Sequence, residues 1–86
     1  MDARTLVARN IRRIRVERGL SQEALAVDAE IDRTYVSRLE RNLENPTIGV
    51  LERVARALEC EIVELFASAG SGRLPTLKPG RKPIRK

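Results

Sequence analysis

The 86-residue sequence contains no histidine and no tryptophan, and its only cysteine is Cys60. A disulfide within the chain is therefore excluded. No hydroxyl or thiol lies beside a candidate general base, no glycine-rich phosphate loop is present, and no group of ligands has metal spacing. The sequence thus predicts no catalytic residue, no metal site and no cofactor, and we do not expect an enzyme.

Long hydrophobic runs are also missing. No segment reaches the roughly 18 consecutive apolar residues that suggest a membrane-spanning helix, and no signal peptide is evident. We therefore expect a cytoplasmic protein without a membrane partner. The length allows one small domain, so no second domain for a small-molecule effector is expected.

Aromatic residues are scarce, because Tyr35 and Phe66 are the only two. The core must then consist mainly of Leu, Ile, Val and Ala, which favours small packed helices. We predict an all-α fold.

Acidic residues are absent from residues 68–86, which hold six basic residues and three of the four prolines. Residues 1–67 hold the other 11 basic residues and all 12 acidic ones, a balance of −1. We predict a folded domain at 1–67 and a flexible basic tail at 68–86. The tail is either an inert extension or an arm that adds salt-dependent affinity for DNA.

Apolar residues recur at helical spacing in five segments, separated by residues that begin or end helices. Ser21, Asp32 and Thr47 are good N-caps, while Gly19 and Asn42 can end helices. The sequence predicts helices from Ala3 to Arg18, at about 21–28, at about 32–41, from Thr47 to Leu58, and in a short segment around Ile62 to Phe66.

The helices at about 21–28 and 32–41 are joined by about three residues, which is typical of a helix-turn-helix. At about 100° per residue, the polar residues of the second helix share one arc, opposite Val36 and Leu39. Arginine can donate two hydrogen bonds to guanine, and threonine can contact thymine. A solvated helix face is the alternative. The candidates for reading DNA bases are Arg33, Thr34, Ser37 and Arg38.

Several separated motifs surround this helix pair. With them, the sequence resembles the Cro/C1-type helix-turn-helix family of phage-repressor-like (XRE) transcription regulators over Leu6 to Phe66, and within it the controller proteins of restriction-modification systems. The resemblance implies a compact five-helix, lambda-repressor-like DNA-binding domain. The motifs are I-R-x-I-R from Ile11 to Arg15, G-L-S-Q from Gly19 to Gln22, Y-V-S-R-L-E-R from Tyr35 to Arg41, and N-P-T from Asn45 to Thr47.

The resemblance also implies a function and further site residues. We expect a transcription regulator that binds a palindromic double-stranded DNA operator, with the helix at 32–41 in the major groove, and that controls its own promoter. Gln22 is expected to brace Arg33, and Arg15 to form a structural ion pair with Glu40. The expected contacts to the DNA backbone come from Ser21, Gln22, Tyr35, Arg41, Asn45 and Thr47.

A homodimer is expected because one recognition helix reads only a few base pairs, whereas a two-fold dimer doubles the contacts. Its interface is predicted around Val63, Leu65 and Phe66. Two other functions stay open: an antitoxin-like protein-binding module with secondary DNA binding, and a non-specific nucleic-acid-binding protein.

The role of one residue and the backbone conformation of two others stay open. Tyr35 can pack at the edge of the core with its hydroxyl in water instead of contacting a phosphate. Glu30 and Glu59 stand where the family usually has glycine, so a positive φ at either would be mildly strained.

Overall fold

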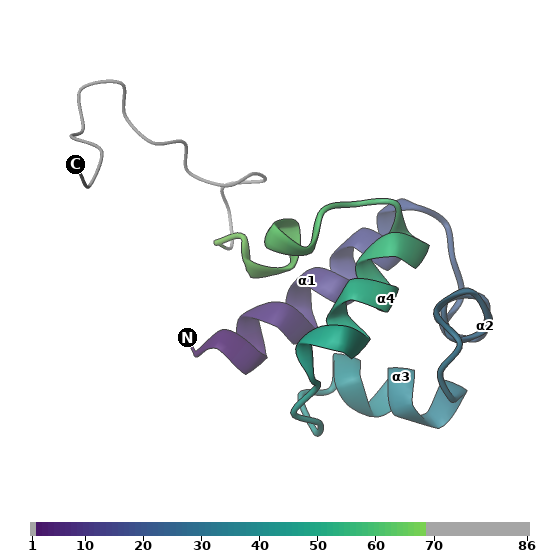
Figure 1. Cartoon of the computed structure of the whole chain (residues 1–86), viewed down its shortest axis with the longest axis horizontal. Helices are drawn as coiled ribbons and strands as arrows, with labels where there is room; N and C mark the ends of the chain where they lie inside the picture. The colour runs from purple at the N-terminus through teal and green to yellow at the C-terminus, as the bar shows by residue number, and fades with distance from the viewer. Residues whose placement is uncertain (1, 69–86) are drawn as a thin grey trace.

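The computed structural model describes residues 2–68, which form four α-helices and one short 3₁₀ helix (Figure 1). The described part contains no strand, so the predicted all-α fold is confirmed. Met1 and residues 69–86, and with them all but Ser68 of the expected basic tail, lie outside the described residues. The elements are α1 (Ala3–Glu17), α2 (Gln22–Ala29), α3 (Arg33–Glu40), α4 (Ile48–Leu58) and η1 (Ile62–Phe66).

The predicted fifth helix differs from the structure in type. The segment η1 is a 3₁₀ helix of five residues, so α-helices number four within residues 2–68. Runs this short are usual for 3₁₀ geometry. Asn10 of α1, which is 4% exposed, donates from Nδ2 to the carbonyls of Leu65 and Ala67, both at 2.9 Å. The end of η1 is thereby attached to α1.

The start of every α-helix has a side-chain cap. A side-chain oxygen accepts a hydrogen bond of 2.8 to 3.1 Å from a backbone N–H in the first turn, which satisfies a donor that lacks a partner in the helix. Three of these caps were predicted from the sequence and are confirmed. The capping residues are Asp2, Ser21, Asp32 and Thr47.

The end of every α-helix is closed by a residue in the left-handed conformation, with φ between 59° and 74°. The next residue then donates its backbone N–H to a carbonyl in the last helical turn, at 2.9 to 3.0 Å. At the end of α1 this residue is a glycine, but at the ends of α2, α3 and α4 it is not, so those three residues carry the strain of a side chain at positive φ. The four left-handed residues are Gly19, Glu30, Asn42 and Glu59.

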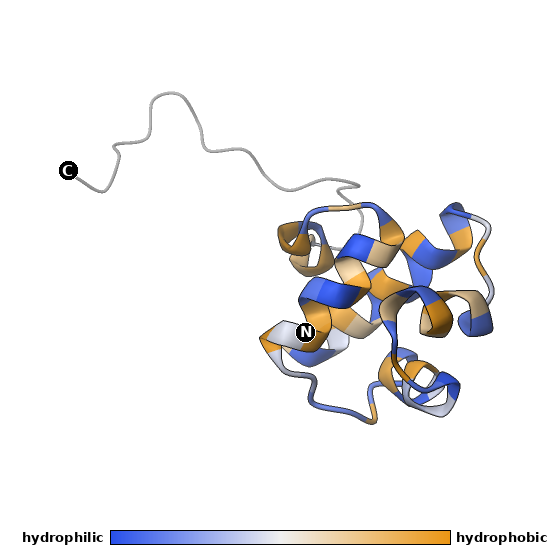
Figure 2. Ribbon diagram, turned by 45° about the vertical axis from the view of Figure 1, so that its right-hand side comes forward, coloured by the Kyte–Doolittle hydropathy of each residue, from blue (hydrophilic) through white to orange (hydrophobic). Residues whose placement is uncertain are grey.

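The core is aliphatic, as the scarcity of aromatic residues predicts. Figure 2 shows hydrophobic and hydrophilic segments alternating along the helices, as expected when each helix has one buried side. Ile11, Leu25, Leu58 and Leu65 are fully buried between the helices. No helix within residues 2–68 is long and apolar enough to cross a membrane.

Candidate nucleic-acid interface

The helix pair α2–α3 is held at a fixed angle by its short turn. Glu30 has a φ of 61°, which reverses the chain directly after α2. The N–H of Ile31 then donates to the carbonyl of Ala26 at 2.9 Å. Asp32 follows immediately and caps α3 through the backbone N–H of Thr34. Three residues therefore end one helix and begin the next, as in a helix-turn-helix.

The two sides of α3 differ sharply in exposure. Val36 and Leu39 are 0% and 2% exposed and pack into the core. Arg33, Thr34 and Arg38 are exposed on the outer side, and Ser37 is half-buried beside them. The division into an apolar and a polar arc is the one that the helical period predicts.

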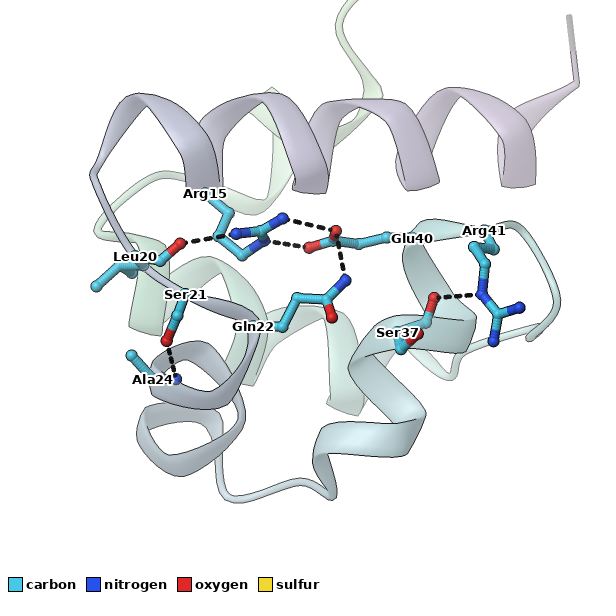
Figure 3. A network of polar contacts seen from close by, with 8 residues as sticks. All are labelled: Arg15, Leu20, Ser21, Gln22, Ala24, Ser37, Glu40 and Arg41. Atoms are coloured by element: carbon cyan, nitrogen blue, oxygen red, sulfur yellow. Dashed lines mark hydrogen bonds and ion pairs between the residues drawn. The ribbon is translucent and has the colours of Figure 1, made fainter.

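The inner side of α3 also carries an ion pair that ties it to α1 and α2 (Figure 3). Arg15 donates from Nε to Oε2 of Glu40 at 2.6 Å and from Nη2 to Oε1 at 3.0 Å. Its Nη1 donates to the Leu20 carbonyl at 2.7 Å. The side chains of Arg15 and Glu40 are only 12% and 2% exposed, so this pair is largely withdrawn from water. It is the pair that the family resemblance implies.

Gln22 takes part in this network in a way that the sequence did not predict. Its Nε2 donates to Oε1 of Glu40 at 3.1 Å, so in this structure Gln22 braces Glu40 and not Arg33 (Figure 3). The physical reason is that Glu40 carries a buried charge whose oxygens need several donors. The contact of Gln22 with a phosphate stays a prediction.

The outer side chains of α3 fall into two groups. The side chains of Arg33, Thr34 and Ser37 form no hydrogen bond or ion pair within residues 2–68. Arg38 instead donates from Nε to Oε2 of Glu44 at 2.7 Å, and Arg41 donates to the Ser37 carbonyl at 3.3 Å. The first turn of α3 is therefore free to bind a partner.

The other expected backbone contacts lie around this surface. Ser21, Asn45 and Thr47 are exposed, and the hydroxyls of Ser21 and Thr47 already accept the capping bonds of α2 and α4. Each hydroxyl keeps its hydrogen for donation to an anion. Tyr35 is half-buried at the edge of the core. Burial, and then the charge of Glu44, raise the pKa of its hydroxyl, which therefore stays a donor at neutral pH.

The three expected dimer residues are not equivalent. Val63 and Phe66 are 46% and 36% exposed, but Leu65 is fully buried and packs in the core. Leu65 therefore has no exposed surface in this structure to offer a partner. Phe66 borders an open depression of about 160 Å³ that Ile48 also lines, and Ile48 is 62% exposed.

Residues 2–68 contain no group of three or more potential metal ligands. Burial, followed by the charge of Glu64, raises the pKa of the Cys60 thiol. A raised pKa keeps the thiol protonated at neutral pH, which makes it a poor nucleophile.

Two polar contacts near α3 were not predicted from the sequence. Asn42, with a φ of 62°, donates from Nδ2 to Oγ1 of Thr5 at 2.9 Å and so attaches the end of α3 to the start of α1. Glu44, which follows the end of α3, pairs with Arg38. The signal available for Glu44 was its opposite charge six residues after Arg38, just beyond a helix end.

Comparisons with known proteins also indicate a helix-turn-helix protein. Residues 11–65 match the family model HTH_3, described as helix-turn-helix. The chain is 43% identical over 65 residues to the HTH-type transcriptional regulator y4dJ of Sinorhizobium fredii, covering 76% of this chain and 84% of that protein. A crystal structure of a hypothetical transcription factor from Neisseria superposes with a TM-score of 0.76 at 40% identity, covering 79% and 78% of the two chains.

A solved controller protein is also similar. The restriction-modification controller protein C.Esp1396I, as a tetramer in complex with its natural 35 base-pair operator, superposes with a TM-score of 0.71. The identity is 41%, over 77% of this chain and 87% of that one. The chain therefore belongs to the Cro/C1-type helix-turn-helix family of DNA-binding transcription regulators, and its relatives include restriction-modification controller proteins.

Proposed function

We propose that the protein binds a palindromic DNA operator as a homodimer and controls its own promoter, with α3 in the major groove. The observation that carries the proposal is the first turn of α3, where Arg33 and Thr34 are exposed and have no partner within residues 2–68. The N-terminal residues of a recognition helix are those that usually contact base edges. The similar controller protein C.Esp1396I is solved in complex with its operator, which supports DNA binding by this chain.

Rigidity of the helix supports direct reading of bases. A bidentate contact between arginine and guanine requires the guanidinium to be held in a defined position by the helix that carries it. The buried pair of Arg15 and Glu40 fixes the far side of α3 to α1, and Gln22 fixes it to α2. Arg33 therefore projects from a helix that cannot rotate without breaking this network.

The charge of the domain favours sequence-specific binding to DNA over a general attraction to its phosphates. Residues 1–67 carry 11 basic and 12 acidic residues, so the domain as a whole has little attraction for a polyanion. Binding by residues 1–67 must then depend on where individual side chains lie. A homodimer would place two copies of α3 about 34 Å apart, in successive major grooves on one side of the DNA.

The dimer surface that we propose consists of three exposed apolar side chains. Phe66 and Ile48 line the same depression, and Val63 belongs to η1 like Phe66. Phe66→Glu would place two like charges in that interface. The variant should sediment as a monomer while the wild type sediments as a dimer. A wild type that is monomeric both alone and on DNA would contradict the homodimer.

Footprinting on the promoter upstream of its own gene tests the function directly. Wild-type protein should protect two half-sites related by a two-fold axis, and Arg33→Ala should lose that protection at the same protein and salt concentrations. Equal binding to promoter and random DNA at physiological salt would indicate a non-specific nucleic-acid-binding protein instead. A partner protein that co-purifies and displaces DNA would favour the antitoxin-like alternative.

A further inference from the structure

The turn after α3 brings an acidic side chain back to the outer side of the helix. Asn42 adopts a left-handed conformation with a φ of 62°. The N–H of Leu43 consequently donates to the carbonyl of Arg38 at 2.9 Å. The next residue, Glu44, therefore starts beside the last turn of α3. Asn42 is itself attached to Thr5 of α1, so the position of this turn is fixed.

Arg38 is held by this turn through two contacts. Its Nε donates to Oε2 of Glu44 at 2.7 Å, and its Nη2 donates to the carbonyl of Leu43 at 3.2 Å. A guanidinium has five N–H donors, so three remain for another partner, two of them on Nη1. The side chains of Arg38 and Glu44 are 44% and 27% exposed, so the pair is accessible from outside.

Glu44 has a second neighbour on the same surface. Its charge contributes, after burial, to the raised pKa of Tyr35. A carboxylate therefore lies close to two residues that are candidates for DNA contact. A carboxylate at a DNA-facing surface repels phosphates and competes with them for the arginine.

We infer that Glu44 is a specificity-determining positioning residue that acts through Arg38. The inference rests on the proposed function. Glu44 holds the guanidinium in one orientation, which leaves both Nη1 donors available for a base edge. Its negative charge also weakens the attraction of Arg38 for phosphates, and phosphate contacts do not depend on the base sequence. Arg38 then strengthens binding to the matching operator more than binding to random DNA.

The test compares wild type with Glu44→Gln in the full chain, on the footprinted operator and on random DNA of equal length, over a range of salt concentrations. Glu44→Gln should tighten binding to random DNA by about three- to tenfold, since it frees one phosphate-binding charge, and increase the salt slope on random DNA by about one. Operator affinity should change less, so the ratio of the two affinities should fall. The melting temperature should stay close to that of wild type, because the pair is exposed.

Glu17→Gln is the matched control. Glu17 forms an exposed ion pair with Arg13 at 3.3 Å on α1, so its change removes the same charge and the same type of pair. Arg13 also contacts Asn10, which holds η1, so this pair lies on the η1 side of α1. Glu17→Gln should leave the ratio of operator to random affinity unchanged.

The double variant Arg38→Ala/Glu44→Gln separates positioning from simple repulsion. In the Arg38→Ala background, Glu44→Gln should no longer change the affinity ratio. A ratio that falls equally with and without Arg38, or a ratio that Glu44→Gln leaves unchanged in the otherwise wild-type protein, would overturn the inference. A wild type without any operator preference would instead overturn the proposed function, so the two failures are distinguishable.

Discussion

Two arginine–glutamate pairs involve α3, one on each side of the helix. Arg15 and Glu40 meet at 2.6 Å on the inner side, where their side chains are 12% and 2% exposed. Arg38 and Glu44 meet at 2.7 Å on the outer side, where the exposed fractions are 44% and 27%. The shortest distances are nearly equal, but the inner pair has two hydrogen bonds and little access to water, whereas the outer pair has one hydrogen bond and is exposed.

This difference determines what each pair can do. Breaking a largely buried pair leaves a charge without solvent, which costs several kcal/mol, whereas an exposed pair is worth about 0 to 1 kcal/mol. The inner pair can therefore hold the helix in place, and only the outer pair can exchange partners. Within one helix, burial separates a structural contact from one available for binding.

The largest effect is expected from Glu40→Ala. This substitution would leave Arg15 largely buried with only the Leu20 carbonyl as partner, and Gln22 would lose its acceptor. We expect a loss of about 3 kcal/mol in the free energy of unfolding, near the lower end for a broken buried pair because Arg15 keeps some access to water. Urea denaturation measures it. An unfolding midpoint equal to that of wild type would remove the distinction between the two pairs.

The double variant Arg15→Met/Glu40→Leu is the control for that result. It removes both charges and fills the space with apolar side chains, so no unpaired charge is left. The double variant should be more stable than Glu40→Ala alone. If it is equally unstable, packing and not charge explains the loss.

The next effect concerns Arg33, which has no partner within residues 2–68. Arg33→Ala breaks no pair, so the melting temperature should not change. Operator affinity should fall by about 1 to 3 kcal/mol, with relaxed preference at one base position in each half-site. Binding titrations on single-base operator variants measure this. Equal weakening on every sequence would make Arg33 a phosphate contact.

A smaller effect of opposite sign is expected from Glu30→Gly. The substitution relieves a left-handed residue with a φ of 61° and leaves both ion pairs in place. The protein should gain about 0.5 to 1 kcal/mol of stability, because the relief of strain exceeds the added freedom of the unfolded chain. Thermal unfolding provides the measurement. A loss of stability would mean that the added freedom of the unfolded chain exceeds the relief of strain.

The smallest effect on stability is expected from Glu44→Ala. The outer pair is accessible to water, so its removal should cost no more than about 1 kcal/mol. The difference in unfolding free energy between wild type and variant should be smaller at high salt than at low salt, because salt screens the pair. A cost as large as that of Glu40→Ala would show that exposure does not separate the two pairs.

Helix ends were the part of the fold most readily predicted from the sequence. The caps at Ser21, Asp32 and Thr47 depend on atoms within three residues, so the local sequence contains the information. Asn42 ends α3 for a similarly local reason. The outward arc of α3 followed from the helical period alone.

Contacts between distant residues could not be predicted in this way. Arg15 and Glu40 are 25 residues apart, and only the family resemblance indicated their pairing. Asn10 reads as one polar residue in α1, and its role emerges only when η1 packs beside it. Five residues of η1 are too few for a period to separate buried Leu65 from exposed Phe66.

Tyr35 has a consequence for how this protein can be observed. It is the only tyrosine in a chain that has no tryptophan, so it dominates the intrinsic fluorescence. Its ring lies at the edge of the core within α3, near the carboxylate of Glu44. The protein thus carries a single native optical probe beside the Arg38–Glu44 pair, and any rearrangement there can be followed without a label.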